Sequence, residues 1–373
     1  MKKNLLASTA LVAAGVLASQ GALAENMPIE LKVGGYMEQW VGWSWTDSKY
    51  SGQNDINDLD VQMDAEIHFE GRTTLDNGLS FGVNVQMEAE GSNSSTDTVD
   101  EAYLFVRGDF GEILLGSENG AAYAMHYGLA SHGTGLDSGD LSNWIVGTDF
   151  ALHTTSNFAR RDNDSNKIRW ISPRFSGVQL GLSWAPEATQ DDDGFPQEVS
   201  GSALTGDNDR LRNEEGVAAG AINYDNKFGS TRIRASLSGQ YFTDSNQNGD
   251  EPWTAGGGLY VGFSNWEVGG SYVFENNVSN NIASRQVAGG SVKYFDGVMG
   301  ASFAVTYGQQ RTFARDDVQW GAELGGKYIL GPGVEARGSL FYANRDEDIN
   351  GPVPAGQSNG DTQGFALVGG IRL

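Results

Sequence analysis

The sequence predicts an all-β protein that forms a sixteen-stranded antiparallel transmembrane β-barrel. Three observations lead to this prediction. Apolar and polar residues alternate over long segments, and short turns alternate with long polar loops along the chain. After the N-terminal segment, no run approaches the roughly 20 apolar residues that a membrane-spanning helix needs. Strands rather than helices are therefore expected to cross the membrane.

Residues 1–24 have the three parts of an export signal. Lys2 and Lys3 form a basic start, a short apolar core of Leu, Ala and Val follows, and residues 22–24 form a small-x-small cleavage site. A retained N-terminal helix is the alternative, but it does not account for this complete pattern. Residues 25–373 are therefore expected to form one barrel domain that works outside the cytoplasm.

Composition and charge exclude several classes of protein. The chain has no cysteine, so as an exported protein it has neither disulfides nor thiolate metal ligands. Its net charge is −24, and loss of Lys2 and Lys3 with the signal makes it −26. Phosphate backbones are bound by positively charged surfaces, so nucleic acid is not expected as a partner.

Residues 58–72 show the alternation most clearly. One parity carries Leu59, Val61, Met63, Ala65, Ile67 and Phe69, and the other carries Asp58, Asp60, Gln62, Asp64, Glu66, His68, Glu70 and Arg72. A period of two over this length predicts a β-strand with one apolar and one water-facing side. Residues 76–78, Asp-Asn-Gly, tolerate positive φ and predict a tight turn before the alternation resumes at Phe81.

Connections of two kinds set the number of strands. Short turns are expected at residues 76–78, 108–111, 176–177, 225–229, 264–265, 296–297 and 331–333. Long polar loops are expected at residues 45–57, 91–98, 117–165, 187–214, 244–252, 276–285, 310–317 and 346–361. Seven turns and eight loops join sixteen strands. Short periplasmic turns opposite long extracellular loops are typical of outer-membrane barrels.

A soluble β-sandwich is the alternative, because its strands also alternate. Two features favour the membrane. The predicted strands reach about 10 residues or more, whereas strands of soluble proteins most often have about 5 to 6. Aromatic residues also gather at strand ends, as the two interfaces of a bilayer require: Trp40, Trp43, Trp45, Trp253, Phe263, Trp266, Phe274, Tyr294, Phe295 and Tyr342.

Five segments in order along the chain resemble the Gram-negative general porins, trimeric sixteen-stranded proteins such as those of alphaproteobacteria. The segments are LKVGGYMEQW (31–40), FEGRTTLDNGLSFG (69–82), RGDFGEILLGSENG (107–120), NKIRWISPRFSGVQLGLSW (166–184) and TQGFALVGGIRL (362–373). Each motif alone is weak, but their order spans nearly the whole mature chain. One departure is the last residue, Leu373, where the family commonly has an aromatic residue.

This resemblance implies a homotrimer in the outer membrane of a Gram-negative bacterium, in contact with lipid and lipopolysaccharide. It also implies a water-filled channel for passive diffusion of small hydrophilic solutes and ions. In the family the third extracellular loop folds into the lumen and narrows it, and residues 117–165 occupy the matching position. The acids of this expected constriction loop are Glu118, Asp137, Asp140 and Asp149.

The charged residues of the strands are expected to face the lumen, because a charge near the bilayer midplane strongly prefers water to lipid. The expected acidic wall comprises Asp60, Asp64, Glu66, Glu70, Glu88 and Glu101. The expected basic wall comprises Arg107, Arg160, Arg161, Lys167, Arg169, Arg232 and Arg234. A low-dielectric wall focuses the field of the acids, so we expect a pore that prefers cations. The alternative is a balance of both signs and weak selectivity.

The acidic loops also offer oxygen ligands. Asp191, Asp192 and Asp193 are a candidate site for structural Ca²⁺ or Mg²⁺, although a solvated loop is the favoured explanation of such a cluster. No other cofactor is expected.

Enzymatic activity is not expected, because the chain has no nucleophile elbow, zinc motif or phosphate-binding glycine loop. Two alternatives to a general pore remain. A channel selective for one solute class, such as sugars, would need a run of lumenal aromatic residues. A structural or adhesive barrel would not conduct ions.

Overall fold

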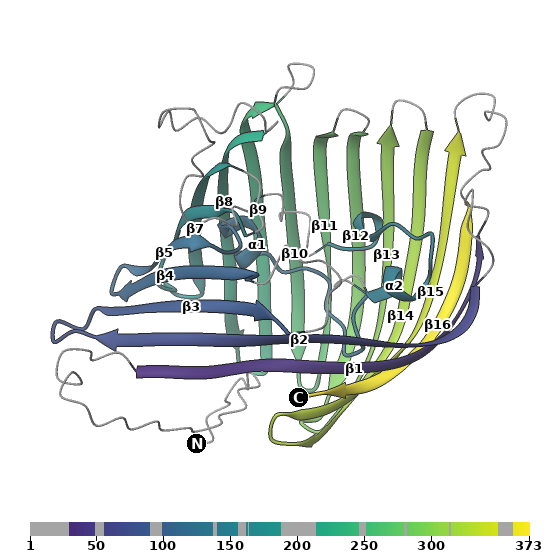
Figure 1. The fold of residues 1–373 in the computed structure, drawn as a ribbon, viewed down its shortest axis with the longest axis horizontal. Helices are drawn as coiled ribbons and strands as arrows, with labels where there is room; N and C mark the ends of the chain where they lie inside the picture. Colours follow the sequence, from purple (N-terminus) through teal and green to yellow (C-terminus); the bar gives the residue numbers. More distant parts are fainter. Residues whose placement is uncertain are drawn as a thin grey trace, which may run out of the picture.

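The computed structural model describes residues 30–48, 56–89, 99–136, 140–155, 162, 164–187, 214–245, 251–279, 282–312, 315–349 and 361–373. Within these ranges sixteen antiparallel strands form one closed barrel (Figure 1). Each strand pairs with its neighbours in sequence, and the first pairs with the last. The predicted fold class is confirmed, and a single closed sheet excludes the two packed sheets of a sandwich.

The strands are β1 (Glu30–Ser48), β2 (Ile56–Thr74), β3 (Ser80–Glu88), β4 (Glu101–Gly108), β5 (Gly111–Ser117), β6 (Asn166–Ile171), β7 (Val178–Glu187), β8 (Glu214–Phe228), β9 (Thr231–Ser245), β10 (Trp253–Phe263), β11 (Trp266–Ser279), β12 (Ile282–Phe295), β13 (Met299–Thr312), β14 (Arg315–Gly331), β15 (Val334–Ile349) and β16 (Thr362–Arg372). Two short helices, α1 (Ala121–Met125) and α2 (Asp140–Trp144), and a 3₁₀ turn, η2 (Phe150–Leu152), lie between β5 and β6. No helix among the described residues is long and apolar enough to cross a membrane.

The barrel is apolar outside and polar inside. Leu237 and Leu367 are 67% and 60% exposed, whereas the carboxylate residues Asp317 and Glu323 are fully buried. Over the first eight residues of β16 buried and exposed residues alternate, because neighbouring side chains of a strand point to opposite faces. Exposed leucines beside buried carboxylates are expected where lipid surrounds the barrel and polar groups line its interior.

Aromatic side chains pair on the outer face near the strand ends. Trp43 packs against Phe365 with ring centroids 5.3 Å apart, and Trp266 packs against Tyr294 at 5.0 Å. Two of the aromatic residues expected at the interfaces point inward instead. Trp40 is 5% exposed and packs in the interior, and Phe295 lies under the Lys327 ammonium group at 4.6 Å.

All seven predicted turns are present, but two predicted loops are mostly strand. β11 and β12 leave only residues 280–281 between them, and β13 and β14 leave only residues 313–314. Polar side chains there continue the ladder, as where Gln310 of β13 donates to Asp317 of β14 at 3.4 Å. These segments were predicted as loops because their residues are polar, but their backbone is paired with the neighbouring strand.

The C-terminus completes the barrel. Leu373 donates its backbone N–H to Met37 at 2.9 Å and accepts from the Met37 N–H at 3.2 Å. Beside it, Arg372 forms an ion pair with Glu38 at 2.8 Å. The aliphatic last residue therefore takes part in the closing ladder, in the place where the family commonly has an aromatic residue.

The segment between β5 and β6 folds into the barrel, as the family resemblance implied. We call residues 117–165 the constriction loop. Its helix α1 packs against β7, β8 and β9, its turn η2 packs against β12, β13 and β14, and α2 packs against β1 and β15. Figure 1 shows α1 and α2 lying across the inner side of these strands.

The close fit of the constriction loop predicts the effect of a single methyl group. A Cβ atom at Gly258 of β10 would overlap the carbonyl oxygen of Tyr127, so Gly258→Ala should displace the loop and cost about 1–3 kcal/mol of stability. The measurements are the temperature at which the barrel unfolds on a gel and the single-channel conductance, which should rise. Gly262→Ala is the control, because its Cβ would have no neighbour closer than 3.7 Å. Equal behaviour of the two variants would contradict the fit.

Candidate channel constriction

Wall hydroxyl groups hold the backbone of the constriction loop. The bonds run from Tyr127 N to Ser236 Oγ (2.8 Å), from His132 N to Ser302 Oγ (2.8 Å) and from Thr134 N to Ser339 Oγ (2.7 Å). A buried backbone N–H needs an acceptor, and the loop has no sheet of its own to supply one. The inward-facing serines of β9, β13 and β15 therefore supply the hydrogen-bond acceptors that a neighbouring strand supplies within a sheet.

Glu323 of β14 is the strongest single anchor. Its buried carboxylate accepts the backbone N–H groups of Gly135 at 3.3 Å and Leu136 at 3.2 Å. It also accepts the Ser339 hydroxyl at 2.6 Å. Hydrogen bonds to a charged acceptor are roughly twice as strong as neutral ones, so this carboxylate fixes the loop at the middle of the wall.

Apolar packing also holds the constriction loop against the wall. Leu136, Leu141, Trp144 and Ile145 of the loop are buried in one cluster with Trp40 of β1 and with residues of β13, β15 and β16. The loop therefore covers a wall that would otherwise present apolar side chains to the lumen.

The described acids of the constriction loop hold the loop in place. Glu118 forms an ion pair with Arg169, and burial raises the pKa of the Glu118 carboxyl. Asp149 accepts the Ala151 N–H at 2.9 Å and caps η2, while its own N–H donates to Gln319 at 2.7 Å. Asp137 and the side chain of Asp140 lie outside the described residues.

Acidic partners lie beside the predicted basic residues that the structure describes. Arg107 pairs with Glu112 at 2.6 Å, Arg232 pairs with Asp225, and Arg234 pairs with Glu267 at 2.6 Å. Lys167 and Arg169 are 4% and 8% exposed at the root of the loop, where Lys167 donates to the carbonyl oxygens of Glu118 and Ser165. Arg160 and Arg161 lie outside the described residues.

The predicted acidic wall lies on β2, β3 and β4, across the lumen from most of the loop contacts. Tyr36 of β1 donates to Asp64 at 3.1 Å and to Glu66 at 2.7 Å, and His68 contacts Glu66 at 2.6 Å. Gln62, of the same parity on β2, donates to the Asn143 carbonyl of the loop at 3.3 Å. This contact shows that the parity of Asp60, Asp64, Glu66 and Glu70 faces the interior.

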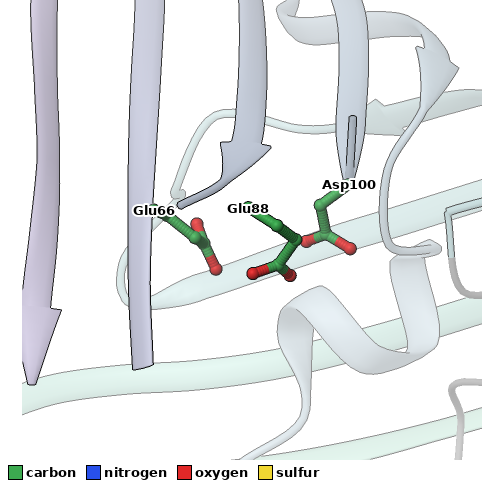
Figure 2. A group of neighbouring side chains, drawn as sticks. All are labelled: Glu66, Glu88 and Asp100. Atoms are coloured by element: carbon green, nitrogen blue, oxygen red, sulfur yellow. The ribbon is translucent and has the colours of Figure 1, made fainter. Parts of the chain in front are cut away.

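Two carboxylates of this wall converge with that of Asp100, which directly precedes β4. One oxygen atom from each of Glu66, Glu88 and Asp100 lies within 4.8 Å of the others (Figure 2). Carboxylate oxygens at this spacing are suited to a hard cation such as Ca²⁺ or Mg²⁺. The triplet for which a metal was predicted, Asp191 to Asp193, lies outside the described residues.

The sequence contained a signal for part of this cluster. Glu66 and Glu88 are opposite each other in the ladder, and each is eleven residues from Asn77 of the turn (77 − 66 = 88 − 77). Once the turn is centred on Asn77, the two carboxylates must meet. The position of Asp100 could not be predicted in this way, because a long loop before it does not fix which residue of β3 it lies opposite.

Three histidines lie in the constriction loop, and burial lowers the pKa of His126, His132 and His153 to about 4. His153 is fully buried, with its Nδ1 3.1 Å from Gln319 Nε2 and 3.0 Å from the Asp149 carbonyl oxygen. The charges of Lys293, Lys327 and Arg337 lower the pKa of His132 further. All three imidazoles are therefore neutral at pH 7.

The sequence matches the Gram-negative porin family over residues 7–348. The chain therefore belongs to the Gram-negative porin family, and it forms a channel in the outer membrane. No curated protein sequence matches the chain.

Two solved structures are similar to the chain in fold. The anion-selective porin from Comamonas acidovorans has 16% identity and a TM-score of 0.57, with 92% of this chain and 99% of that chain covered. The trimer form of OmpT, an outer membrane protein of Vibrio cholerae, has 13% identity and a TM-score of 0.56, with the same coverage. At these identities the likeness shows the fold alone.

The histidines predict that acid loosens the constriction loop. The released loop binds protons with the usual pKa of about 6.5, so their contribution to stability is full above pH 6.5 and is lost as pH falls toward 4. We expect the unfolding temperature to fall between pH 7 and pH 4.5. Replacement of all three histidines by asparagine should remove this part of the pH dependence.

The comparison with the asparagine variant is needed because acids of the loop act in the opposite sense. Burial raises the pKa of Glu118 and Asp162, so acid favours their folded state. If the variant and the wild type respond equally to pH, the histidines do not contribute.

Proposed function

We propose that the chain is a passive diffusion channel for small hydrophilic solutes and ions that prefers cations. The observation that carries this proposal is the uneven distribution of charge around the lumen. The acidic wall on β2 has Asp58, Asp60, Asp64, Glu66 and Glu70 on one parity before the first lysine or arginine of that parity, Arg72.

The opposite side of the lumen also carries basic groups, but acids lie among them. Arg232 of β9 pairs with Asp225. Four further basic groups share two acids, which leaves two positive charges against the five acids of β2: Arg234 and Lys293 share Glu267, and Lys327 and Arg337 share Glu335. Of the predicted loop acids, Glu118 is paired with Arg169 of β6, and the Asp149 carboxylate accepts from the backbone of η2. Because low-dielectric walls focus the remaining negative field, cations should concentrate at the constriction.

Selectivity for sugars has less support. A sugar channel needs a run of aromatic faces open to the lumen, but Trp40, Phe105 and Trp144 are 5%, 2% and 3% exposed. These three aromatic residues therefore pack the loop and the wall and present no open face to the lumen.

We also propose a homotrimer, supported by the uneven height of the wall. β3, β4, β5 and β6 have 9, 8, 7 and 6 residues, whereas β14 and β15 have 17 and 16. A strand of about 8 residues tilted by about 45° rises only about 19 Å, less than the apolar band of about 25 Å. Neighbouring copies would cover this low wall, and a solved relative in fold is described as a trimer form.

Charge removal tests the cation preference. The combined change Asp60→Asn, Asp64→Asn and Glu66→Gln should lower the cation-to-anion permeability ratio several-fold, measured as the reversal potential in a salt gradient. Three acids of the exposed periplasmic turns give a matched control: Asp76→Asn, Asp109→Asn and Asp296→Asn should leave the ratio unchanged. Anion preference of the wild type would refute the proposal.

An arginine on the low wall tests the trimer. Leu104 of β4 and Leu324 of β14 both have the lipid-facing parity, at 39% and 57% exposure in the single chain. Leu104→Arg should abolish the band near three times the monomer mass on an unheated gel, because it places a charge inside the interface. Leu324→Arg carries a similar cost in lipid, about 2–4 kcal/mol at the midplane, but should keep the trimer. Loss of the band in both variants, or in neither, would contradict the interface.

A further inference from the structure

Three buried polar side chains lie side by side on the inner face of the wall, near the extracellular ends of β9, β10 and β11. Gln240 is the ladder partner of Thr254, and Thr254 is the ladder partner of Glu275. Directly opposite residues of an antiparallel pair point to the same face, with Cβ atoms about 4.5–5.5 Å apart. The three residues are 3%, 3% and 2% exposed, and we call them the inner oxygen row.

Each member of the inner oxygen row keeps one oxygen atom to which no described residue donates a hydrogen bond. These atoms are Gln240 Oε1, Thr254 Oγ1 and Glu275 Oε1. Buried polar atoms in folded proteins are nearly always paired, so three neighbouring acceptors without a donor point to a shared partner from outside the chain.

Contacts on both sides turn the free oxygen atoms toward the middle strand, β10. Glu275 gives its Oε2 to the guanidinium of Arg285, its ladder partner on β12, so its Oε1 faces the opposite side. Gln240 donates its Nε2 to Asp162 of the constriction loop. Asp162 lies against Gly120, next to α1, which packs on β7, β8 and β9, so the Gln240 nitrogen is drawn away from β10 and its carbonyl oxygen faces β10.

The chemistry of the row suits a hard cation. A carboxylate, an amide carbonyl and a hydroxyl oxygen are ligands that Ca²⁺ accepts, and water completes its six to eight contacts. Mg²⁺ demands a near-ideal octahedron, which oxygen atoms on three rigid strands do not supply. A water molecule can bridge the same atoms, but only a cation also stabilises the negative charge of Glu275, of which Arg285 contacts a single oxygen.

We propose that the inner oxygen row binds one Ca²⁺ ion through Gln240 Oε1, Thr254 Oγ1 and Glu275 Oε1. Because Gln240 also holds Asp162, the ion would join β10 and β11 to the strand that anchors the end of the constriction loop. A single protein carboxylate makes the site weak, with a Kd of about 10⁻³ M. The site is separate from the acidic wall of β2 and does not depend on ion selectivity.

Thermal unfolding in the presence of Ca²⁺ alone tests the proposal on the full-length protein, folded in detergent without lipopolysaccharide. Ca²⁺ at about ten times the expected Kd should raise the unfolding temperature by a few degrees relative to a chelator, because it binds only the folded state. Mg²⁺ at the same concentration should have a smaller effect. Thr254→Val removes the central hydroxyl at nearly constant volume and should reduce the Ca²⁺-dependent shift. Thr254→Ser keeps the hydroxyl and should retain the shift.

Thr306→Val on β13 is the matched control. Its hydroxyl is also buried and without a partner among the described residues, but its ladder partners are Gly289 and Gly321, which have no side-chain oxygen. This variant should keep the wild-type response to Ca²⁺. If Thr254→Val fails to fold, Gln240→Met makes the same test.

Equal Ca²⁺-dependent shifts in the wild type and Thr254→Val would overturn the proposal, whether water fills the row or Ca²⁺ binds at other acidic groups. An equal response to Mg²⁺, or an equal loss of the shift in Thr306→Val, would also overturn it. The measurement does not involve permeability, so its failure is distinct from failure of the cation preference.

Discussion

Closure of the sheet by β1 and β16 is the constraint on which the rest of the structure depends. Hydrocarbon offers no hydrogen-bond partner, so every backbone N–H and C=O of a membrane-spanning strand must be paired within the protein. The ladder from Glu38 opposite Arg372 to Ser48 opposite Thr362 removes the two edges that a sixteen-stranded open sheet would expose. Once the ring is closed, alternate side chains must face either lipid or the interior.

The interior that closure creates is too wide for side chains alone to fill, and the constriction loop occupies much of it. The loop obtains its hydrogen bonds from wall residues such as Glu323 and Ser339, and its apolar contacts from Trp40 and its neighbours. Polar side chains that line the lumen thereby also bind the constriction loop. The acidic wall of β2 is largely left uncovered by the loop, and this division gives the lumen two unlike sides.

The sequence allowed the barrel and the orientation of its side chains to be predicted, because alternation is a local property. Leu59 outward and Lys167 inward follow from counting along one strand. Contacts that depend on how strands align could not be predicted in this way. Glu323 meets the backbone of Leu136, 187 residues away in the chain, and neither residue carries a local sign of the other. Polar strand ends near Gln310 were misread as loops for the same reason, since composition does not reveal pairing.

The wall at β7–β11 is one polypeptide layer thick, and both of its faces restrict what the sequence can tolerate. Gly181 and Gly258 leave room for Met125 and Tyr127 of the loop on the inner face, while Gly220 keeps the outer face hollow. Substitutions on adjacent residues are therefore opposed by different neighbours, the loop on one side and the membrane on the other. Packing therefore limits sequence change in this part of the barrel, even though none of these glycines carries a functional group.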